Sequence, residues 1–338
     1  MKRVRIVLLS VLTLSTGLPG AGGVSDSQQD DPSAPNLSSQ LSNLQIDASS
    51  AAEIERAITQ QDYQSAEKIL VEEAERVPRS KRSAKFLVIA AGVFFLDRQY
   101  LNAAIAWKKA EAITPLDDRS RFTLAMAYIK LDKREWARPE LEKLASERPQ
   151  DPLYLYWLAR LEYDGRNYSS AVDRLKTVLE LDPKMARAYD TLGLCYDYLG
   201  RFEDAVANFD RAIELNRLQA KPSPWPNVDL ANSLIALNRL PEAEENLRAA
   251  VGYDQRLPQA HYQLGRVLEM QGRYQDALDS LKAAVTLAPD YADPHYLLGR
   301  IYHRLGDEPQ SKAEIARFQE LKKAAERPAA TGAVQPHL

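Results

Sequence analysis

The chain has 338 residues, enough for two ordinary domains or for one extended array of repeats. Apolar residues make up 45% and charged residues 27%, and glycine is scarce at 14, a bias that favours helix over strand. A formal net charge of −3 is too mild to indicate a nucleic-acid-binding protein. The single cysteine, Cys195, excludes an intrachain disulfide framework and a cysteine-rich metal site.

The first segment has the pattern of a secretory signal. Three of the first five residues are basic, and residues 6–14 (IVLLSVLTL) form an apolar run. This run is too short for a membrane-spanning helix, which needs roughly 20 apolar residues. Residues 19–23 (PGAGG) then supply small and helix-breaking residues, and no cysteine stands nearby to indicate a lipoprotein. We predict that residues 1–22 are a cleaved signal peptide and that the protein is exported, periplasmic or secreted; an uncleaved anchor is the alternative.

The segment after the signal is polar. Residues 23–46 are rich in Ser, Asp, Gln and Pro and contain few large apolar side chains. Such a segment cannot bury enough surface to offset the entropy lost on ordering. We therefore predict a disordered linker over 23–46, and a second disordered segment at the C-terminal tail, 326–338.

The clearest repeat unit begins at residue 186. Its apolar and small residues stand at helical spacing: Tyr189, Leu192, Gly193, Tyr196, Ala205, Phe209 and Ala212. The pattern resembles the tetratricopeptide repeat, with tyrosine at the first position in place of the usual tryptophan. In such a unit a small residue, here Gly193, lets the second helix approach the first closely. An Ala and a Phe four residues apart on the second helix then fill the groove.

The unit recurs with a period of 34 residues. Starts at 84, 118, 152 and 186 follow without a gap, and starts at 224, 258 and 292 resume after a Pro-rich loop at 218–226 that shifts the phase by four. A degenerate unit begins near 47 and is followed by three extra residues near 79–82. The resemblance therefore covers 47–325. It implies an all-α, right-handed superhelical solenoid of about eight helix-turn-helix repeats.

Two features modify this regular array. The longer loop at 218–226 predicts two rigid halves that meet at Trp225. Residues 320–327 extend the last helix past its normal end, and we interpret them as part of a C-terminal cap, because a terminal repeat lacks a neighbour on one side.

The sequence contains no recognisable catalytic or metal-binding motif. It has no glycine-rich phosphate loop and no H-E-x-x-H or C-x-x-C motif. His261 and His295 stand 34 residues apart at one repeat position, where packing explains them better than metal ligation. Cys195 lies inside a predicted helix beside large apolar residues, which favours packing over nucleophilic chemistry. We expect no enzyme activity, no metal and no small-molecule cofactor.

The resemblance also implies a concave groove that binds an extended peptide or a helix of a partner. In this family the groove is lined by positions 2, 5, 9, 12 and 13 of each unit. The candidates at those positions are Arg119, Tyr156, Arg160, Tyr163, Arg187, Asp190, Asn232, Tyr262, Arg266, Tyr296, Arg300 and Arg304. Tyrosine and arginine recur at positions 5 and 9, and both are common at binding hot spots. The alternative is that they only pair with each other along a solvated wall.

Charge along the predicted groove changes sign. The middle units carry Asp190, Asp197 and Asp229, whereas the units on either side lean basic. Such a pattern would set the register of a partner with complementary charges. Chaperone-tail binding is not expected, because that subtype of the family uses a Lys–Asn pair and only Asn232 matches here, with Val228 beside it.

Three functions remain open from the sequence. The leading hypothesis is an exported adaptor that binds a protein or peptide partner in the groove. The alternative is a structural or assembly factor of a cell-envelope complex, in outer-membrane biogenesis, secretion or polysaccharide export. An enzymatic role is the third, for which the sequence offers no site.

Overall fold

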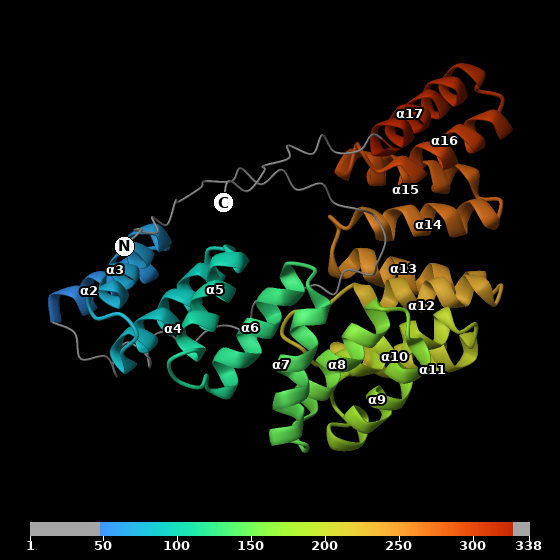
Figure 1. Cartoon of the computed structure of the whole chain (residues 1–338). Coiled ribbons are helices and arrows are strands. Elements are labelled where there is room, and N and C mark those ends of the chain that lie inside the picture. The colour runs from blue at the N-terminus through green and yellow to red at the C-terminus, as the bar shows by residue number, and fades with distance from the viewer. Residues whose placement is uncertain (1–47, 327–338) are drawn as a thin grey trace.

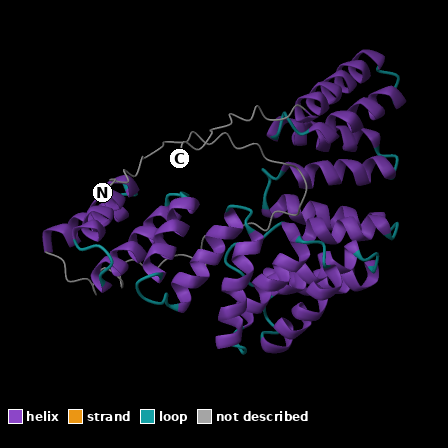
Figure 2. Ribbon diagram, in the orientation of Figure 1, coloured by secondary structure: helices purple, strands orange, loops and turns teal. Residues whose placement is uncertain are grey.

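A computed structural model describes residues 48–326, and this part of the chain folds into sixteen helices without a strand (Figure 1, Figure 2). The predicted all-α repeat solenoid is confirmed. The predicted signal peptide and linker lie outside the described residues, as does all of the predicted tail except Glu326, which ends the last helix.

The helices follow one another in eight pairs. In chain order they are α2 (Ala48–Thr59) and α3 (Tyr63–Arg76), α4 (Lys81–Leu96) and α5 (Tyr100–Glu111), α6 (Asp118–Lys130) and α7 (Arg134–Glu147), α8 (Pro152–Asp164) and α9 (Tyr168–Leu181), α10 (Ala186–Tyr198) and α11 (Phe202–Asn216), α12 (Trp225–Ala236) and α13 (Leu240–Tyr253), α14 (Pro258–Met270) and α15 (Tyr274–Leu287), and α16 (Ala292–Arg304) and α17 (Glu308–Glu326).

The second pair begins before the start predicted at residue 84. α4 begins at Lys81 and is 16 residues long. The Ser80 side chain caps it by accepting a hydrogen bond from the Ser83 backbone N–H at 3.0 Å, which stabilises a helix N-terminus. The extra residues near 79–82 therefore lengthen the helix in part, where the sequence pattern placed them between units.

Each pair turns through one residue with a positive φ. These residues are Gln61, Arg98, Asp132, Arg166, Gly200, Asn238, Gly272 and Gly306, with φ between 56° and 78°. The left-handed conformation costs a non-glycine residue about 1–2 kcal/mol. The tight turn is therefore unstrained at the three glycines and strained at Gln61, Arg98 and Arg166, while Asp132 and Asn238 are of types that tolerate this conformation better.

Within a pair, a small residue on the first helix lets the second helix lie close. A Cβ added at Gly193 would lie 2.6 Å from the Phe209 ring, and one added at Gly265 would lie 2.6 Å from Cγ of Leu281. Phe209 and Leu281 are fully buried, so neither has free space to move into. The close approach predicted at Gly193 is confirmed.

The pairs stack into an open arc that runs from α2 to α17 (Figure 1). Most first helices contact the first helix of a neighbouring pair: α4 contacts α6, and α8, α10, α12, α14 and α16 form a continuous series. In a curved stack, the elements that approach most closely lie on the inner side. We call the surface formed by the even-numbered helices the inner wall.

The hydrophobic core continues through the Pro-rich loop. One core extends from α8 to α16 and includes Phe209 before the loop and Val228 after it, with Trp225 packed against it. Asn216 fixes the loop, because its side chain donates to the Ser223 carbonyl at 2.7 Å and accepts from the Ser223 N–H at 2.9 Å. Packing is therefore continuous at Trp225, where the sequence predicts that two halves meet.

Candidate functional site

The predicted groove residues lie on the even-numbered helices, and the structure gathers most of them in two places. Near the C-terminal end one pocket collects Tyr262, Arg266, Tyr296 and Arg300. In the middle of the inner wall lie Tyr156, Arg160, Tyr163, Arg187, Asp190 and Asn232. Arg119 and Arg304 join neither group: Arg119 is exposed on α6, and Arg304 donates to the Tyr274 hydroxyl on α15 at 3.1 Å.

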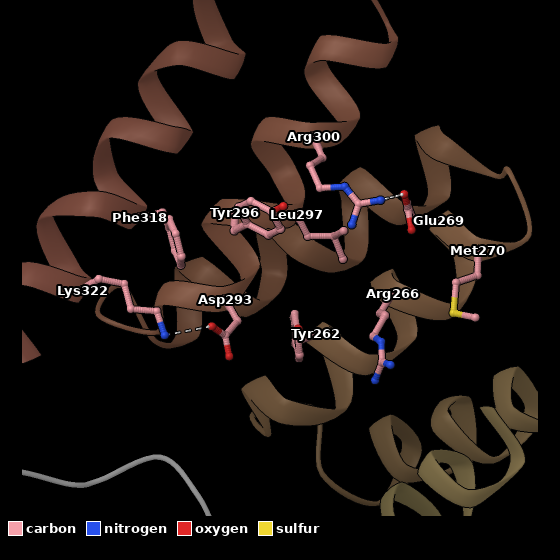
Figure 3. Close-up of a pocket in the computed structure, with 10 residues that line it drawn as sticks. All are labelled: Tyr262, Arg266, Glu269, Met270, Asp293, Tyr296, Leu297, Arg300, Phe318 and Lys322. Atoms are coloured by element: carbon pink, nitrogen blue, oxygen red, sulfur yellow. Dashed lines mark hydrogen bonds and ion pairs between the residues drawn. The ribbon is translucent and has the colours of Figure 1, made fainter. Parts of the chain in front are cut away.

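The C-terminal pocket is a hollow of about 400 Å³ between α14, α16 and α17 (Figure 3). Its lining comprises Tyr262, Arg266, Glu269, Met270, Asp293, Tyr296, Leu297, Arg300, Phe318 and Lys322. The rings of Tyr296 and Phe318 lie with centroids 5.2 Å apart, and Tyr296 is 45% exposed. This aromatic surface is open to solvent and suits an apolar side chain or a stretch of backbone.

Ion pairs border the C-terminal pocket. Arg300 Nη2 donates to Glu269 Oε1 at 3.0 Å, and Lys322 Nζ lies 3.6 Å from Asp293 Oδ1 (Figure 3). In both pairs a cation stands beside a carboxylate, so these four charges balance. The pocket therefore combines an aromatic surface with groups of both signs at its edge.

Helix α17 supplies two lining residues that the repeat positions do not predict, Phe318 and Lys322. The groove positions of the family belong to the first helix of each unit, whereas α17 is the second helix of the last pair. It is also the last helix of the described chain, so its side borders the pocket (Figure 3). A single aromatic residue, Phe318, in a helix otherwise rich in Lys, Glu and Ala is the sequence signal that marks this contribution.

A second group of functional candidates lies on α8, α10 and α12. We call it the central cluster and define it as Arg160, Tyr163, Asp190, Asp197, Tyr198 and Asp229. The Arg160 guanidinium lies over the Tyr163 ring at 5.1 Å from its centroid, and Tyr163 meets Tyr198 edge-on at 5.8 Å. Ser233 on α12 donates to Oδ1 of Asp197 on α10 at 2.5 Å. These contacts tie three successive first helices together.

Burial perturbs the carboxyl groups of the central cluster. Asp190 and Asp229 are 7% and 8% exposed. Burial raises the pKa of Asp190 to about 7, and the nearby Arg160 opposes the rise. Burial also raises the pKa of Asp229 well above its usual range; the carboxylates of Asp190 and Asp197 add to that rise, and Arg160 opposes it. A raised carboxyl pKa means that the surroundings do not fully stabilise the negative charge.

Three buried polar atoms of this region have no hydrogen-bond partner among the described residues. They are Nη1 of Arg160, Oδ1 of Asp190 and Oδ1 of Asn232. Buried polar groups in folded proteins are nearly always hydrogen-bonded, and an unmet one costs about 1–3 kcal/mol. One donor and two acceptors on neighbouring first helices are therefore left for other groups to satisfy.

Two of the predicted groove residues act in packing. Tyr156 is only 2% exposed, and its hydroxyl lies 3.5 Å from Oγ1 of Thr191. The Arg187 guanidinium covers the Tyr156 ring at 4.6 Å from its centroid. Arginine and tyrosine therefore stack on each other at this point of the wall.

The surroundings of Cys195 and of the two repeat-position histidines, His261 and His295, fit a packing role. Burial raises the pKa of the Cys195 thiol to about 12, which keeps it protonated. His295 Nδ1 lies 2.6 Å from Glu314 Oε2, and His261 Nε2 lies 2.9 Å from the Gln255 carbonyl. In the described range no three His, Cys, Asp or Glu side chains are placed to hold a metal ion. Within that same range, no helix combines the length and apolar character needed to cross a bilayer.

Models of known protein families match the chain over the segments that carry the repeat pattern. Family models described as tetratricopeptide repeat match residues 122–186, 186–218, 228–292 and 268–328. Together these segments cover more than half of the chain and include both groups of candidate residues on the inner wall.

Two curated proteins are similar to parts of the chain. The BBSome complex member BBS4 homolog of Drosophila melanogaster is 21% identical over 141 residues, which are 41% of this chain and 29% of that protein. The cytochrome c-type biogenesis protein CycH of Rhizobium meliloti is 30% identical over 129 residues, which are 37% of this chain and 32% of that protein. The chain thus spans about a third of the length of these curated relatives.

Among solved structures, that of PilW, a widely conserved type IV pilus biogenesis factor, has a similar fold. Its TM-score is 0.56 at 20% sequence identity, and the match covers 62% of this chain and 98% of that one. At this identity the likeness concerns the fold alone.

Proposed function

The chain belongs to the tetratricopeptide repeat family, and on this basis we propose that it is an exported, non-catalytic adaptor whose inner wall binds a segment of a partner protein. The segment is an extended peptide or a helix that lies along the even-numbered helices. Stacked repeats suit this role because they present a long curved surface while each repeat contacts only its neighbours.

The observation that carries this proposal is the C-terminal pocket. Four residues selected by their groove positions, Tyr262, Arg266, Tyr296 and Arg300, line a single hollow of about 400 Å³. Tyrosine and arginine are the types that most often dominate binding energy at interfaces. Tyr296, with 45% of its surface exposed, is well placed to contact a partner.

Export is the part of the proposal supported by the N-terminal sequence pattern. If residues 1–22 are removed during export, the mature protein begins at Gly23, the last of the small residues at 19–23. N-terminal sequencing of the protein recovered from the producing cells tests this. A mature N-terminus near residue 23 supports export, and an intact Met1 on all of the protein argues against cleavage.

A second candidate function is assembly of a cell-envelope complex. The observation that favours it is the similarity to a protein named for cytochrome c-type biogenesis. In this role the outer surface or the ends of the array would be the working parts. Co-fractionation with a large envelope complex that persists after substitution of the inner wall would favour this function over the adaptor.

The adaptor proposal is tested by affinity capture with substituted proteins. The pocket variant combines Tyr296→Ala and Arg300→Ala, both at exposed positions, so the fold should persist. The matched control combines Tyr253→Ala and Arg256→Ala, which are exposed and lie outside both groups of inner-wall residues. We expect the pocket variant to lose the partner that the wild type and the control retain. Equal capture of the partner by all three proteins would mean that the inner wall does not bind it.

A further inference from the structure

When its carboxyl groups are ionised, the central cluster holds more negative than positive charge. Three carboxyl groups, those of Asp190, Asp197 and Asp229, influence one another or the single guanidinium of Arg160. Arg160 is also shared with Asp164, whose Oδ1 lies 3.6 Å from its Nη2. The C-terminal pocket differs in this respect, because each of its two carboxylates has a cation beside it: Arg300 beside Glu269 and Lys322 beside Asp293.

Within the described residues, hydrogen bonds satisfy the carboxyl groups of the central cluster only in part: Asp197 accepts from Ser233, whereas Asp190 has an unmet oxygen. Oδ1 of Asp190 has no partner among the described residues, although Asp190 is only 7% exposed. Oδ1 of Asn232, which stands one helical turn after Asp229 on α12, has none either. Carboxylates that are buried without enough positive partners are costly. A cation brought to the cluster would supply both charge and hydrogen-bond donors.

The most exposed side chain of the central cluster is an aromatic one, Tyr198. Tyr198, at the end of α10, is 57% exposed and stacks on Tyr168 with ring centroids 4.7 Å apart. Its neighbour Asp197 is half-buried, whereas Asp190 and Asp229 lie deeper. A ring face attracts a cation, and a carboxylate beside it strengthens the attraction. A ligand that approaches over Tyr198 therefore meets both before it reaches the deeper carboxyl groups.

We propose that the central cluster binds a basic side chain, lysine or arginine, of the partner segment. The proposal rests on the proposed function, because the segment that carries this side chain is the one that lies along the inner wall. Its apolar stem lies against Tyr198, and its charged head lies between Asp197 and Asp229. The two sites then bind different parts of the segment: the C-terminal pocket binds an apolar part, and the central cluster binds a positive charge.

Short peptides test this charge preference without any knowledge of the partner. The probe is acetyl-Gly-Gly-Lys-Gly-Gly-amide, compared with peptides that carry arginine or norleucine in place of lysine; norleucine keeps the apolar stem and lacks the charge. Each is titrated at pH 8 into deuterated, nitrogen-15-labelled protein, and the backbone amide signals of α10 and α12 are followed. We expect the lysine and arginine peptides to shift these signals, with the norleucine peptide roughly tenfold weaker.

Substitutions locate the effect. Asp197→Asn with Asp229→Asn removes two charges with little change of shape, and circular dichroism checks that the helices remain. The matched control, Glu203→Gln with Asp279→Asn, removes the same charge from exposed positions on second helices. We expect the cluster variant to bind the lysine peptide about tenfold more weakly than the control.

Three results would overturn the assignment. One is equal binding of the norleucine and lysine peptides, which would mean that the cluster recognises backbone or apolar stem. Another is the absence of shifts on α10 and α12 with every peptide. The third is unchanged binding in the cluster variant. These results are separate from partner capture: peptide binding can fail while capture through the C-terminal pocket persists, which rejects the basic side chain and leaves the adaptor proposal standing.

Discussion

Replacing Gly193 by alanine tests how closely the helices of a pair pack. The added Cβ would lie 2.6, 2.7 and 2.9 Å from three atoms of the Phe209 ring. The ring is fully buried in the core, so it can relieve the clash only by moving other side chains. Overpacking of this kind costs about 1–3 kcal/mol, while exchanging glycine for alanine inside a helix gains about 1 kcal/mol. We expect a net loss of about 1 kcal/mol.

The control for this substitution is Gly252→Ala on α13. A Cβ added at Gly252 meets nothing within 4 Å, so only the helix propensity changes, and we expect a gain of roughly 0.5–1 kcal/mol. Unfolding in urea, followed by circular dichroism, measures both variants. Phe209→Leu should make Gly193→Ala less costly, because leucine stands opposite alanine at the same spacing in other pairs, as Leu141 does opposite Ala125. If Gly193→Ala stabilises the protein as much as Gly252→Ala does, the steric reasoning is refuted.

Three further predictions concern turns, buried charge and pH. Arg166→Gly should stabilise the protein by about 0.5–1 kcal/mol in urea unfolding, because φ at this turn is 61° and glycine adopts it without strain; destabilisation would contradict this. Arg121→Ala should destabilise by about 3 kcal/mol in the same assay, because Arg121 is 4% exposed and bonds Glu140 at 2.5 Å and Glu111 at 2.7 Å; a change below about 1 kcal/mol would show that these carboxylates find other partners. The pKa of Asp190, raised by burial to about 7, lies above its unfolded value, so the folded state binds this proton more tightly, and the resulting stability is present at low pH and lost as pH rises through about 7. The difference in urea midpoint between pH 5.5 and pH 8 should therefore be smaller in Asp190→Asn than in the wild type, and an equal difference would contradict the burial argument.

The pair packing was predictable from sequence because it depends on residues at fixed, local spacing. Gly193 and Phe209 stand 16 residues apart in one unit, and the short turn between the helices brings them together whatever the rest of the array does. The early start of α4 was not predictable from the period, since extra residues can lengthen either a loop or a helix. The side-chain cap at Ser80 favours a helix that begins at Lys81, and the 34-residue period carries no information about this cap.

The exposure of individual groove residues was not predictable in the same way. Tyr156 and Tyr296 occupy the same position of their units, yet Tyr156 is 2% exposed and Tyr296 is 45% exposed. Residues of the next pair, Arg187 and Thr191, cover Tyr156. Tyr296 belongs to the last described pair, so within the described residues no following first helix covers it, and its ring packs against Phe318 of α17. Exposure thus depends on the neighbouring pair, which the repeat pattern does not specify.

Site-specific photo-crosslinking in the producing cells tests most directly whether the inner wall binds a partner. A photoreactive amino acid is placed at Tyr296 in the C-terminal pocket in one protein and at Tyr253, at the end of α13, in another; both positions are exposed. We expect one partner to be crosslinked from Tyr296 and not from Tyr253, and we expect Arg300→Ala to abolish this product. A partner crosslinked from Tyr253 alone, or equally from both positions, would contradict this expectation.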